Sequence, residues 1–308
     1  YFWPLCRCSS FAKIQLLIGI LNLNQTTSLV PESLVKELLQ PYTKQEQKAI
    51  KEDLQNIRSL IFTHLKKAPG ERVYVATAGG PGASKSTILE SYLAHLPYGK
   101  SFAYIDPDQR GLKFMINTYV SDINNYAYSM NPHDNALLKE KYNKWRNASN
   151  YIANTLLNEA FKKKYAIAHG TTSSSPFMKD FYQTLKKKGY KITLLLCASS
   201  YENRLNAIKH REDVQKFVQA TPEDVMNKVN LFYKNFPVYF DFADEIHMFW
   251  TDKFSEGSKE VALFAKNSKI KILDESDFEK FKNSYETFRS QQTNTSLPSF
   301  NEITHTHH

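Results

Sequence analysis

The sequence predicts an α/β fold in which a mostly parallel sheet is covered by helices on both faces and preceded by a helical extension. Short apolar runs recur along the chain, and segments with helical spacing of apolar residues lie between them. Strands that are apolar on both faces and alternate with helices are typical of a buried parallel sheet. We expect strands at 73–77, 102–105, 165–168 and 192–196, and additional strands at 245–249 and 261–265.

The composition is that of a folded, basic chain. Of its 308 residues, 42% are hydrophobic and 13% aromatic, which excludes disorder throughout. The net charge of +9 attracts anions, but does not choose between nucleotide, nucleic acid and acidic lipid. The lysine runs 162–164 and 186–188 fall at the ends of expected helices, where cations suit the helix dipole. Because no nucleic-acid motif accompanies them, nucleic-acid binding is the weaker interpretation.

The first 30 residues have no regular pattern. The apolar stretch 14–23 is too short to span a membrane, and no small-residue cleavage site follows it. We therefore expect a packed helix or a mobile leader there. Three cysteines, Cys6, Cys8 and Cys197, do not form a disulfide framework, which favours a reducing compartment such as the cytoplasm. A zinc site at Cys6 and Cys8 is disfavoured, because no second Cys/His pair has metal spacing.

Three parts of the chain are expected. Residues 1–70 form a helical N-terminal extension, with helices near 31–39 and 44–66 predicted from their apolar spacing. Residues 71–273 form the domain that carries the sheet. Residues 274–308 form a polar tail, which we expect to be mobile; its terminal histidines are interpreted as a disordered end.

A glycine-rich segment lies between the first strand and a helix expected at 88–96. It comprises Gly79, Gly80, Pro81, Gly82, Ala83, Ser84, Lys85, Ser86 and Thr87. It fits the phosphate-binding pattern G-x-x-x-x-G-K-[ST] everywhere except Ser84, where the pattern has glycine. Such a loop cradles phosphates with backbone N–H groups and a helix N-terminus. Lys85 would reach the β- and γ-phosphates and Ser86 would bind Mg²⁺, so ATP and Mg²⁺ are the expected cofactors. An incidental Gly/Pro turn is the alternative.

Polar residues follow the next two strands. Asp106 and Asp108 stand at the carboxyl end of the second strand, where a parallel sheet binds its ligands. A carboxylate there can orient Mg²⁺ or accept a proton from an attacking hydroxyl. An Asp-Pro turn with a helix cap is the alternative. The third strand ends in His169, Thr171 and Ser173, which suit a polar substrate, although the serines that follow can also cap a helix before Pro176.

A basic helix is expected after the fourth strand. It carries Arg204 and Arg211, and a capped helix starts near Thr221. A basic helix followed by a short connector is similar to the mobile lid of a small kinase, whose cations neutralise the transferring phosphoryl group. A solvated basic face is the alternative.

The order of these segments resembles the zeta toxin family of P-loop kinases. The resemblance covers roughly 73–265. Its segments are the glycine-rich loop, Ile105-Asp106-Pro107-Asp108, His169-Gly170-Thr171, Lys188-Gly189-Tyr190, the helix at 208–212, Ala220-Thr221-Pro222 and Asn235-Phe236-Pro237.

This resemblance implies a P-loop kinase-like fold that transfers the γ-phosphate of ATP to a hydroxyl of UDP-N-acetylglucosamine. It implies that Asp108 is the base, that Lys85 and Ser86 bind the phosphates and Mg²⁺, and that Arg211 and Arg204 close over the phosphates. The expected substrate residues are Asp106, Arg110, His169, Thr171 and Ser173. An antitoxin or another protein is a possible partner, although no residue identifies one.

The chain also departs from the family pattern. Glutamate is common at His169 and arginine at Ser173, and the two lid arginines align with His210 and Gln219. Arg211 can replace the first of these by a shift of one residue. Together with Ser84, these departures leave a second hypothesis open: a nucleotide-binding or interaction protein without kinase turnover.

Overall fold

The computed structural model describes residues 28–63, 65, 72–129, 135–215, 220–292 and 297–305. The apolar stretch 14–23, Cys6, Cys8, Gln219 and the last two histidines lie outside these ranges. Within the described residues, no helix combines the length and the hydropathy needed to cross a membrane.

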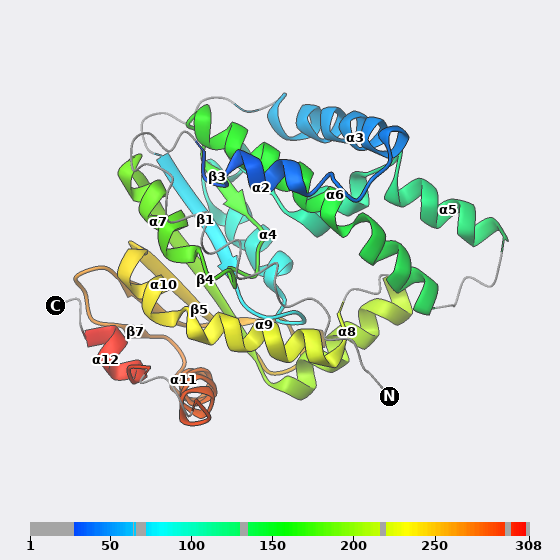
Figure 1. Ribbon diagram of the computed structural model, residues 1–308. Coiled ribbons are helices and arrows are strands. Elements are labelled where there is room, and N and C mark those ends of the chain that lie inside the picture. The colour runs from blue at the N-terminus through cyan, green and yellow to red at the C-terminus, as the bar shows by residue number, and fades with distance from the viewer. Residues whose placement is uncertain are drawn as a thin grey trace, which may run out of the picture.

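A seven-stranded sheet forms the centre of the described chain, in the order β2-β3-β1-β4-β5-β6-β7 (Figure 1). Strands β1 to β5 pair in parallel, whereas β6 and β7 are antiparallel. The predicted mostly parallel sheet is therefore confirmed. Its strands are β1 Arg72–Ala78, β2 Ala103–Ile105, β3 Ile167–His169, β4 Tyr190–Ser199, β5 Glu245–Thr251, β6 Lys259–Ala265 and β7 Lys271–Ile272.

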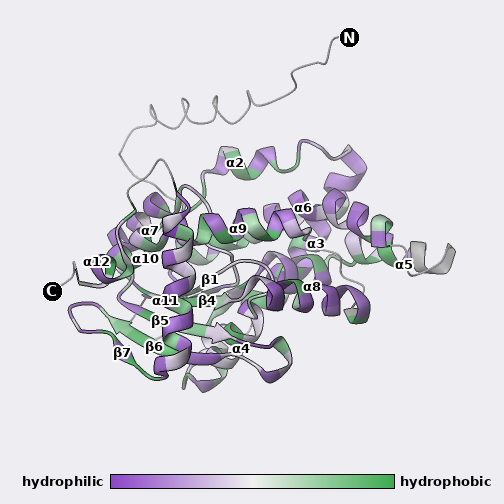
Figure 2. Ribbon diagram, turned by 90° about the horizontal axis from the view of Figure 1, so that it is seen from below, coloured by the Kyte–Doolittle hydropathy of each residue, from purple (hydrophilic) through white to green (hydrophobic). Residues whose placement is uncertain are grey.

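Both faces of the sheet are buried. In β1, Tyr74 and Ala76 belong to the larger apolar cluster, whereas Val75 points into a smaller one. Helix α4 (Lys85–His95) packs on the smaller cluster, and α6 (Asn135–Lys162) and α7 (Met178–Lys187) contact strands of the sheet on the other side (Figure 2). This arrangement confirms the predicted helices on both faces and explains why the strands read as continuous apolar runs.

Two helices precede the sheet, where the sequence predicts them. Helix α2 spans Glu32–Glu37 and α3 spans Lys44–Phe62. Helix α3 begins at a capping box, in which the Thr43 hydroxyl accepts from the backbone N–H of Glu46 and the Glu46 carboxylate accepts from the N–H of Thr43. Its buried residues Ile50, Leu54 and Ile57 belong to the larger cluster of the sheet. The predicted domain boundaries near 70 and 273 stay predictions.

The remaining elements connect or cover the strands. The helices are α5 Tyr119–Ser129, α8 Tyr201–Gln215, α9 Pro222–Lys234, α10 Phe236–Phe242, α11 Glu275–Ser290 and α12 Phe300–His305. Short 3₁₀ turns span Gly99–Ser101, Leu112–Phe114 and Phe254–Glu256, and a single π-helical turn spans Pro107–Gly111.

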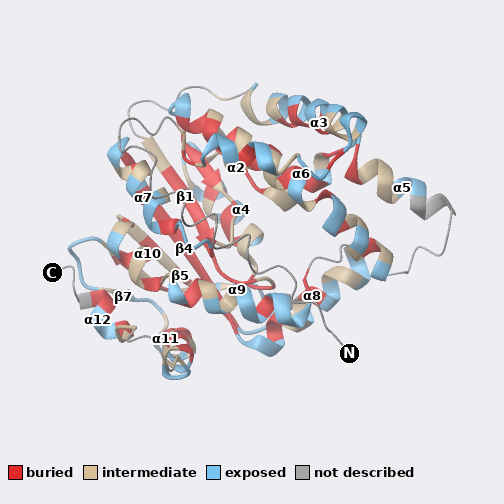
Figure 3. Ribbon diagram, viewed as in Figure 1, coloured by how far each residue is buried: buried red, intermediate tan, exposed pale blue. Residues whose placement is uncertain are grey.

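The expectation of a mobile tail is wrong. Helix α11 is capped by Asp274, whose side chain accepts from the backbone N–H of Asp277, and the aromatic residues of one face are buried. Figure 3 shows buried positions along this helix. Phe281 and Tyr285 are fully buried, and the Tyr285 ring stacks on Phe236 of α10 with 4.8 Å between centroids. The polar composition of the tail comes from the outer face of α11, while its aromatic residues recur at helical spacing.

Candidate active site

The glycine-rich loop joins β1 to α4 and packs directly on the neighbouring strand and helix. A Cβ at Gly79 would lie 2.3 Å from the backbone oxygen of Cys197 on β4. Gly82 has a φ of +76°, and a Cβ there would lie 2.5 Å from the backbone oxygen of Arg204 on α8. Both positions therefore require glycine, and the loop sits against the carboxyl end of β4, where ligands of parallel sheets bind.

Ser84 occupies the position where the phosphate-loop pattern has glycine. Its backbone is left-handed, with φ 54° and ψ 20°, and it is the residue before the first turn of α4. The conformation that glycine adopts freely costs another residue about 1–2 kcal/mol. The loop therefore keeps a glycine-like turn without the glycine.

Lys85 is the first residue of α4, and its ammonium lies over the loop. Its Nζ donates to the backbone oxygen of Gly80 at 2.8 Å. The pKa of Lys85 is lowered to about 8, mainly by burial and also by the charges of Arg211 and Arg204, against the opposing effects of Cys197 and Asp106. Ser86 and Thr87 follow in the first turn of α4, with Ser86 half-buried and Thr87 exposed. Cations from two helices therefore converge on the loop.

Arg204 places a buried guanidinium beside the loop. The residue is 1% exposed, and its Nε donates to the backbone oxygen of Ser199 at 2.9 Å. Its two terminal nitrogens are buried and have no hydrogen-bond partner among the described residues. A Cβ at Gly80 would lie 2.5 Å from one of them. A buried cation with unused donors is costly without an anion, so this position fits a phosphate group.

The basic helix directs Arg211 rather than His210 toward the loop. The His210 ring packs on Phe254, with 5.0 Å between ring centroids. The charge of Arg211 instead lies close enough to lower the pKa of both Lys85 and Lys113. That Arg211 replaces the first lid arginine by a shift of one residue stays a prediction; the second lid position, Gln219, lies outside the described residues.

Asp106 and Asp108 have different surroundings. Asp106 caps the π-helical turn: its Oδ1 accepts from the backbone N–H groups of Asp108 and Gln109, each at 2.8 Å. Burial raises the pKa of Asp106, and the charge of Asp108 adds to this effect. A Cβ at Gly170 would lie 2.0 Å from the other carboxylate oxygen of Asp106, so the backbone just after β3 packs closely against this carboxylate. The helix-cap interpretation therefore holds for Asp106.

Asp108 forms an ion pair with Arg146, a residue that sequence reasoning missed. Arg146 lies in the middle of α6, whose Ser149 also donates to the backbone oxygen of Pro107. Lys113 was missed as well: burial lowers its pKa, the charge of Arg211 adds to this effect, and the charges of Asp106 and Asp108 oppose it. Nothing in the local sequence marks these two cations, because the folding of α6 and of the turn after β2 brings them to the site.

The residues at the end of β3 are bonded to one another and to β1. The pKa of His169 is lowered by burial to about 4, so its imidazole is neutral at pH 7, and its Nδ1 lies 2.8 Å from the Tyr74 hydroxyl. The Ser173 hydroxyl donates to the backbone oxygen of Thr77 at 2.9 Å, and the Thr171 hydroxyl accepts from the backbone N–H of Ser173. These contacts shape the loop, and the predicted substrate roles stay predictions.

Arg110 is the remaining predicted substrate residue. It is exposed, and its guanidinium carbon lies 4.8 Å from the centroid of the Tyr104 ring. It lies within the π-helical turn, on the same segment as Asp108. A substrate role for Arg110 stays a prediction.

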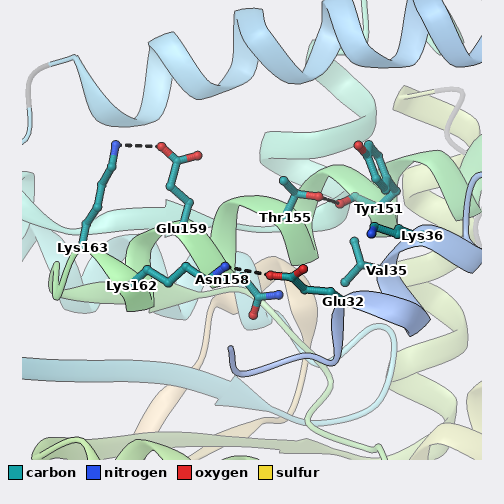
Figure 4. Close-up of a pocket in the computed structure, with 9 residues that line it drawn as sticks. All are labelled: Glu32, Val35, Lys36, Tyr151, Thr155, Asn158, Glu159, Lys162 and Lys163. Atoms are coloured by element: carbon teal, nitrogen blue, oxygen red, sulfur yellow. Dashed lines mark hydrogen bonds and ion pairs between the residues drawn. The ribbon is translucent and has the colours of Figure 1, made fainter. Parts of the chain in front are cut away.

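A cleft of about 430 Å³ lies elsewhere, between α2 and α6 (Figure 4). It contains none of the predicted site residues. Its charged groups are largely paired with each other: Lys162 with Glu32, and Lys163 with Glu159, both at 2.8 Å. We therefore place the candidate active site at the glycine-rich loop and not in this cleft.

The predicted Mg²⁺ would have few protein ligands at the loop. Within the described ranges, no group of three or more His, Cys, Asp or Glu side chains is placed to hold a metal ion. A Mg²⁺ at a phosphate loop takes a Ser/Thr hydroxyl and oxygens of the nucleotide itself, so Ser86 is consistent with a metal that arrives with its nucleotide.

A mostly parallel sheet with a glycine-rich loop between β1 and α4, and cations from α8 beside that loop, define a P-loop kinase-like fold. The family model described as Zeta toxin matches residues 59–269, more than half of the sequence. The chain therefore belongs to the zeta toxin family, as the sequence predicts.

Solved structures show the same fold at low identity. The AvrRxo1-ORF1:ORF2 complex with ATP is 14% identical with a TM-score of 0.58, covering 85% of this chain and 78% of that chain. The PezAT chromosomal toxin–antitoxin system of Streptococcus pneumoniae is 17% identical with a TM-score of 0.51, covering 69% and 80%. No curated protein matches the sequence.

Proposed function

We propose that this protein is an ATP-dependent phosphotransferase that transfers the γ-phosphate to a hydroxyl of a small molecule. The observation that carries the proposal is the buried guanidinium of Arg204. Its two terminal nitrogens have no hydrogen-bond partner within the described part of the chain, and one of them lies against Gly80 of the phosphate loop. A bound polyphosphate would supply the missing acceptors. A solved relative in the same fold is a complex with ATP, which supports this choice of nucleotide.

The residues divide into a nucleotide side and an acceptor side. On the nucleotide side, the loop, Lys85 and Arg204 bind the phosphates, and Arg211 stabilises charge on the transferring group. When bound at Ser86, Mg²⁺ would neutralise charge on the β- and γ-phosphates. On the acceptor side, Asp108 orients the attacking hydroxyl and accepts its proton, while Arg146 holds the carboxylate.

The acceptor is proposed by resemblance to be a UDP-N-acetyl amino sugar. The neighbouring solved structures are an ORF1:ORF2 complex and a toxin–antitoxin system. We therefore propose a protein partner of antitoxin type, which would inhibit the enzyme. A cytoplasmic site of action agrees with a nucleotide substrate.

The proposal is tested by ADP release from Mg·ATP, with and without a panel of UDP-sugars. Stimulation by one sugar nucleotide is expected, and Lys85→Ala is expected to abolish it. Asp108→Asn should lower turnover by about 10²–10⁴-fold, the usual contribution of a positioned base, with little change in ATP affinity. Asp244→Asn is the matched control, because Asp244 also sits in an ion pair but at the opposite end of the fourth strand, bonded to Ile192.

The second candidate is a nucleotide-binding or interaction protein without turnover. The strained Ser84 in the loop favours it. It predicts tight binding of Mg·ATP, with no ADP release above the Lys85→Ala control for any acceptor in the panel. If Asp108→Asn instead retains wild-type turnover, only the assignment of Asp108 as the base is wrong.

A further inference from the structure

Helix α3 reaches the acceptor side of the candidate site through one buried carboxylate. Asp53 is 0% exposed. Its Oδ1 accepts from the backbone N–H of Asn117 at 2.9 Å and from the side-chain amide of Asn117 at 3.0 Å, and its Oδ2 accepts from the Thr118 hydroxyl at 2.7 Å. Asp53 therefore fixes the turn between the π-helical segment and α5.

The start of this turn, Leu112–Phe114, contacts the π-helical turn that carries Asp108. Tyr119 follows Thr118, and the charge of Asp108 contributes to raising the pKa of Tyr119 to about 12, after the larger effect of burial. Lys113, on the same segment, interacts with the charges of both Asp106 and Asp108. A shift of the turn would therefore change the surroundings of the Asp108 carboxylate.

A second contact comes from Tyr42, two residues before the start of α3. The Tyr42 hydroxyl donates to the backbone oxygen of Lys144 at 2.6 Å and accepts from the backbone N–H of Ala148 at 3.0 Å. Its ring stacks on Trp145, with 5.5 Å between centroids and 8° between planes. These contacts surround Arg146, the partner of Asp108, on the same turn of α6.

We propose that the segment 42–57, which precedes the region matched by the family model, is a positioning element for the acceptor side of the site. Asp53 and Tyr42 are its positioning residues. Asp53 sets the turn beside Asp108, and Tyr42 sets the part of α6 that presents Arg146. Within the described residues, neither side chain has a hydrogen bond or ring contact with the glycine-rich loop, so we expect their effect to be confined to the acceptor half. The kinetic part of this inference rests on the proposed function, whereas its structural part does not.

A simple role in stability makes a different prediction. Loss of a buried hydrogen-bonded carboxylate lowers stability anywhere in the fold. Asp277 on α11 is a matched comparison, because it is 4% exposed and bonded to Lys259 and Lys280. A merely structural Asp53 would behave as Asp277 does, with no local effect near Asp108.

The experiment measures hydrogen–deuterium exchange and ligand response in the full chain for Asp53→Ala, Asp53→Asn, Tyr42→Phe and Asp277→Ala. In Asp53→Ala, exchange in 107–121 should rise at least tenfold, while exchange in 79–87 and the Kd for Mg·ATP stay within twofold of wild type. Asp53→Asn should behave as wild type, because an amide oxygen still accepts from Asn117 and the Thr118 hydroxyl can turn to accept. Tyr42→Phe should raise exchange in 140–150, and Asp277→Ala should raise it in neither segment.

Kinetics give the second readout, with UDP-N-acetylglucosamine as the probe acceptor. Asp53→Ala should lower kcat at least tenfold with an unchanged KM for ATP. Wild-type exchange in 107–121 for Asp53→Ala, or an equal rise in 79–87, would overturn the inference. If wild type itself shows no turnover with the panel, the proposed function fails, and the exchange result still decides the positioning role.

Discussion

Arg146 and Asp108 form an ion pair that joins the long helix α6 to the π-helical turn after β2. The two side chains are 31% and 18% exposed, so the pair is only partly solvated. Burial lowers the pKa of Arg146, but the charges of Asp108, Tyr142 and Asp106 and the hydrogen bond to Asp108 together outweigh it, and the pKa is raised overall. The proposed base is therefore held by a fixed cation that comes from a distant part of the sequence.

Removing either member should leave the other charge without its partner. We expect Asp108→Ala and Arg146→Met each to destabilise the fold, and the double variant to lose less than the sum. The coupling should be about 1–2 kcal/mol, below the figure for a fully buried pair because both groups keep some solvent. Urea unfolding of the four proteins measures it, and a coupling near zero would show that the pair does not hold the carboxylate.

Nucleotide binding should weaken as the pH rises through the pKa of Lys85. Burial lowers that pKa to about 8, and only the protonated ammonium attracts phosphate. Between pH 7 and pH 9 the affinity for Mg·ATP should fall about tenfold, because roughly nine tenths of a group with that pKa is neutral at pH 9. Calorimetric titration across this range measures the effect. Lys85→Met should bind more weakly and without this pH dependence; an equal slope in that variant would assign the titration to another group.

The same shift has a consequence for stability without nucleotide. The folded pKa of Lys85 lies below the unfolded value, so the unfolded chain binds more protons between about pH 8 and pH 10.5. The contribution of Lys85 to stability therefore increases as the pH rises through that window. Between about pH 8 and pH 9, the stability of the nucleotide-free protein should therefore rise while its affinity for Mg·ATP falls.

The sequence predicts the parts of the site that are local. The glycines at Gly79 and Gly82 appear as a motif because close backbone packing excludes a side chain at each. Asp106 and Asp108 follow a short apolar run, and the pattern and length of that run predict a strand that ends just before them. The roles of Arg146 and Asp53 cannot be predicted in this way, because only the packing of α6 and α3 on the sheet brings their partners to them.

The tail shows a different limit of sequence reasoning. Its mean polarity indicates mobility, yet Phe281 and Tyr285 recur at helical spacing and meet the aromatic residues of α10. Average composition does not reveal an amphipathic helix, because the residues of its exposed face make the whole segment polar on average. The periodicity of the aromatic residues alone would have indicated α11.

Arg204 is predicted to lower the stability of the nucleotide-free protein and to raise its affinity for Mg·ATP. Its two unpartnered nitrogens are costly in the free protein, so Arg204→Met, which keeps much of the volume, should leave the melting temperature unchanged or higher. Its affinity for Mg·ATP should fall at least about 10²-fold, because two charge-assisted hydrogen bonds at about 1.5–3 kcal/mol each sum to about 3–6 kcal/mol. Thermal shift with and without Mg·ATP measures both. Arg58→Met, which breaks the pair with Glu159, is the control; a nucleotide shift retained in Arg204→Met would contradict the phosphate role.

Ser84→Gly should relieve the left-handed strain of the loop. The backbone cost of about 1–2 kcal/mol is removed, but glycine adds freedom to the unfolded chain, so a net gain of about 0.5 kcal/mol is expected. Removal of the side chain from the loop should also strengthen Mg·ATP binding, by about 2–10-fold. Thermal unfolding and a nucleotide titration of the same samples separate the two effects.

Lys164→Gly is the matched control for this variant. Lys164 is exposed and also left-handed, with a φ of 60°, in the turn between α6 and β3. It should gain stability by a similar amount with no change in Mg·ATP affinity, because the turn is remote from the glycine-rich loop. If Ser84→Gly gains stability but binds nucleotide more weakly, the Ser84 hydroxyl is itself a phosphate ligand, and the loop is specialised rather than degraded by its missing glycine.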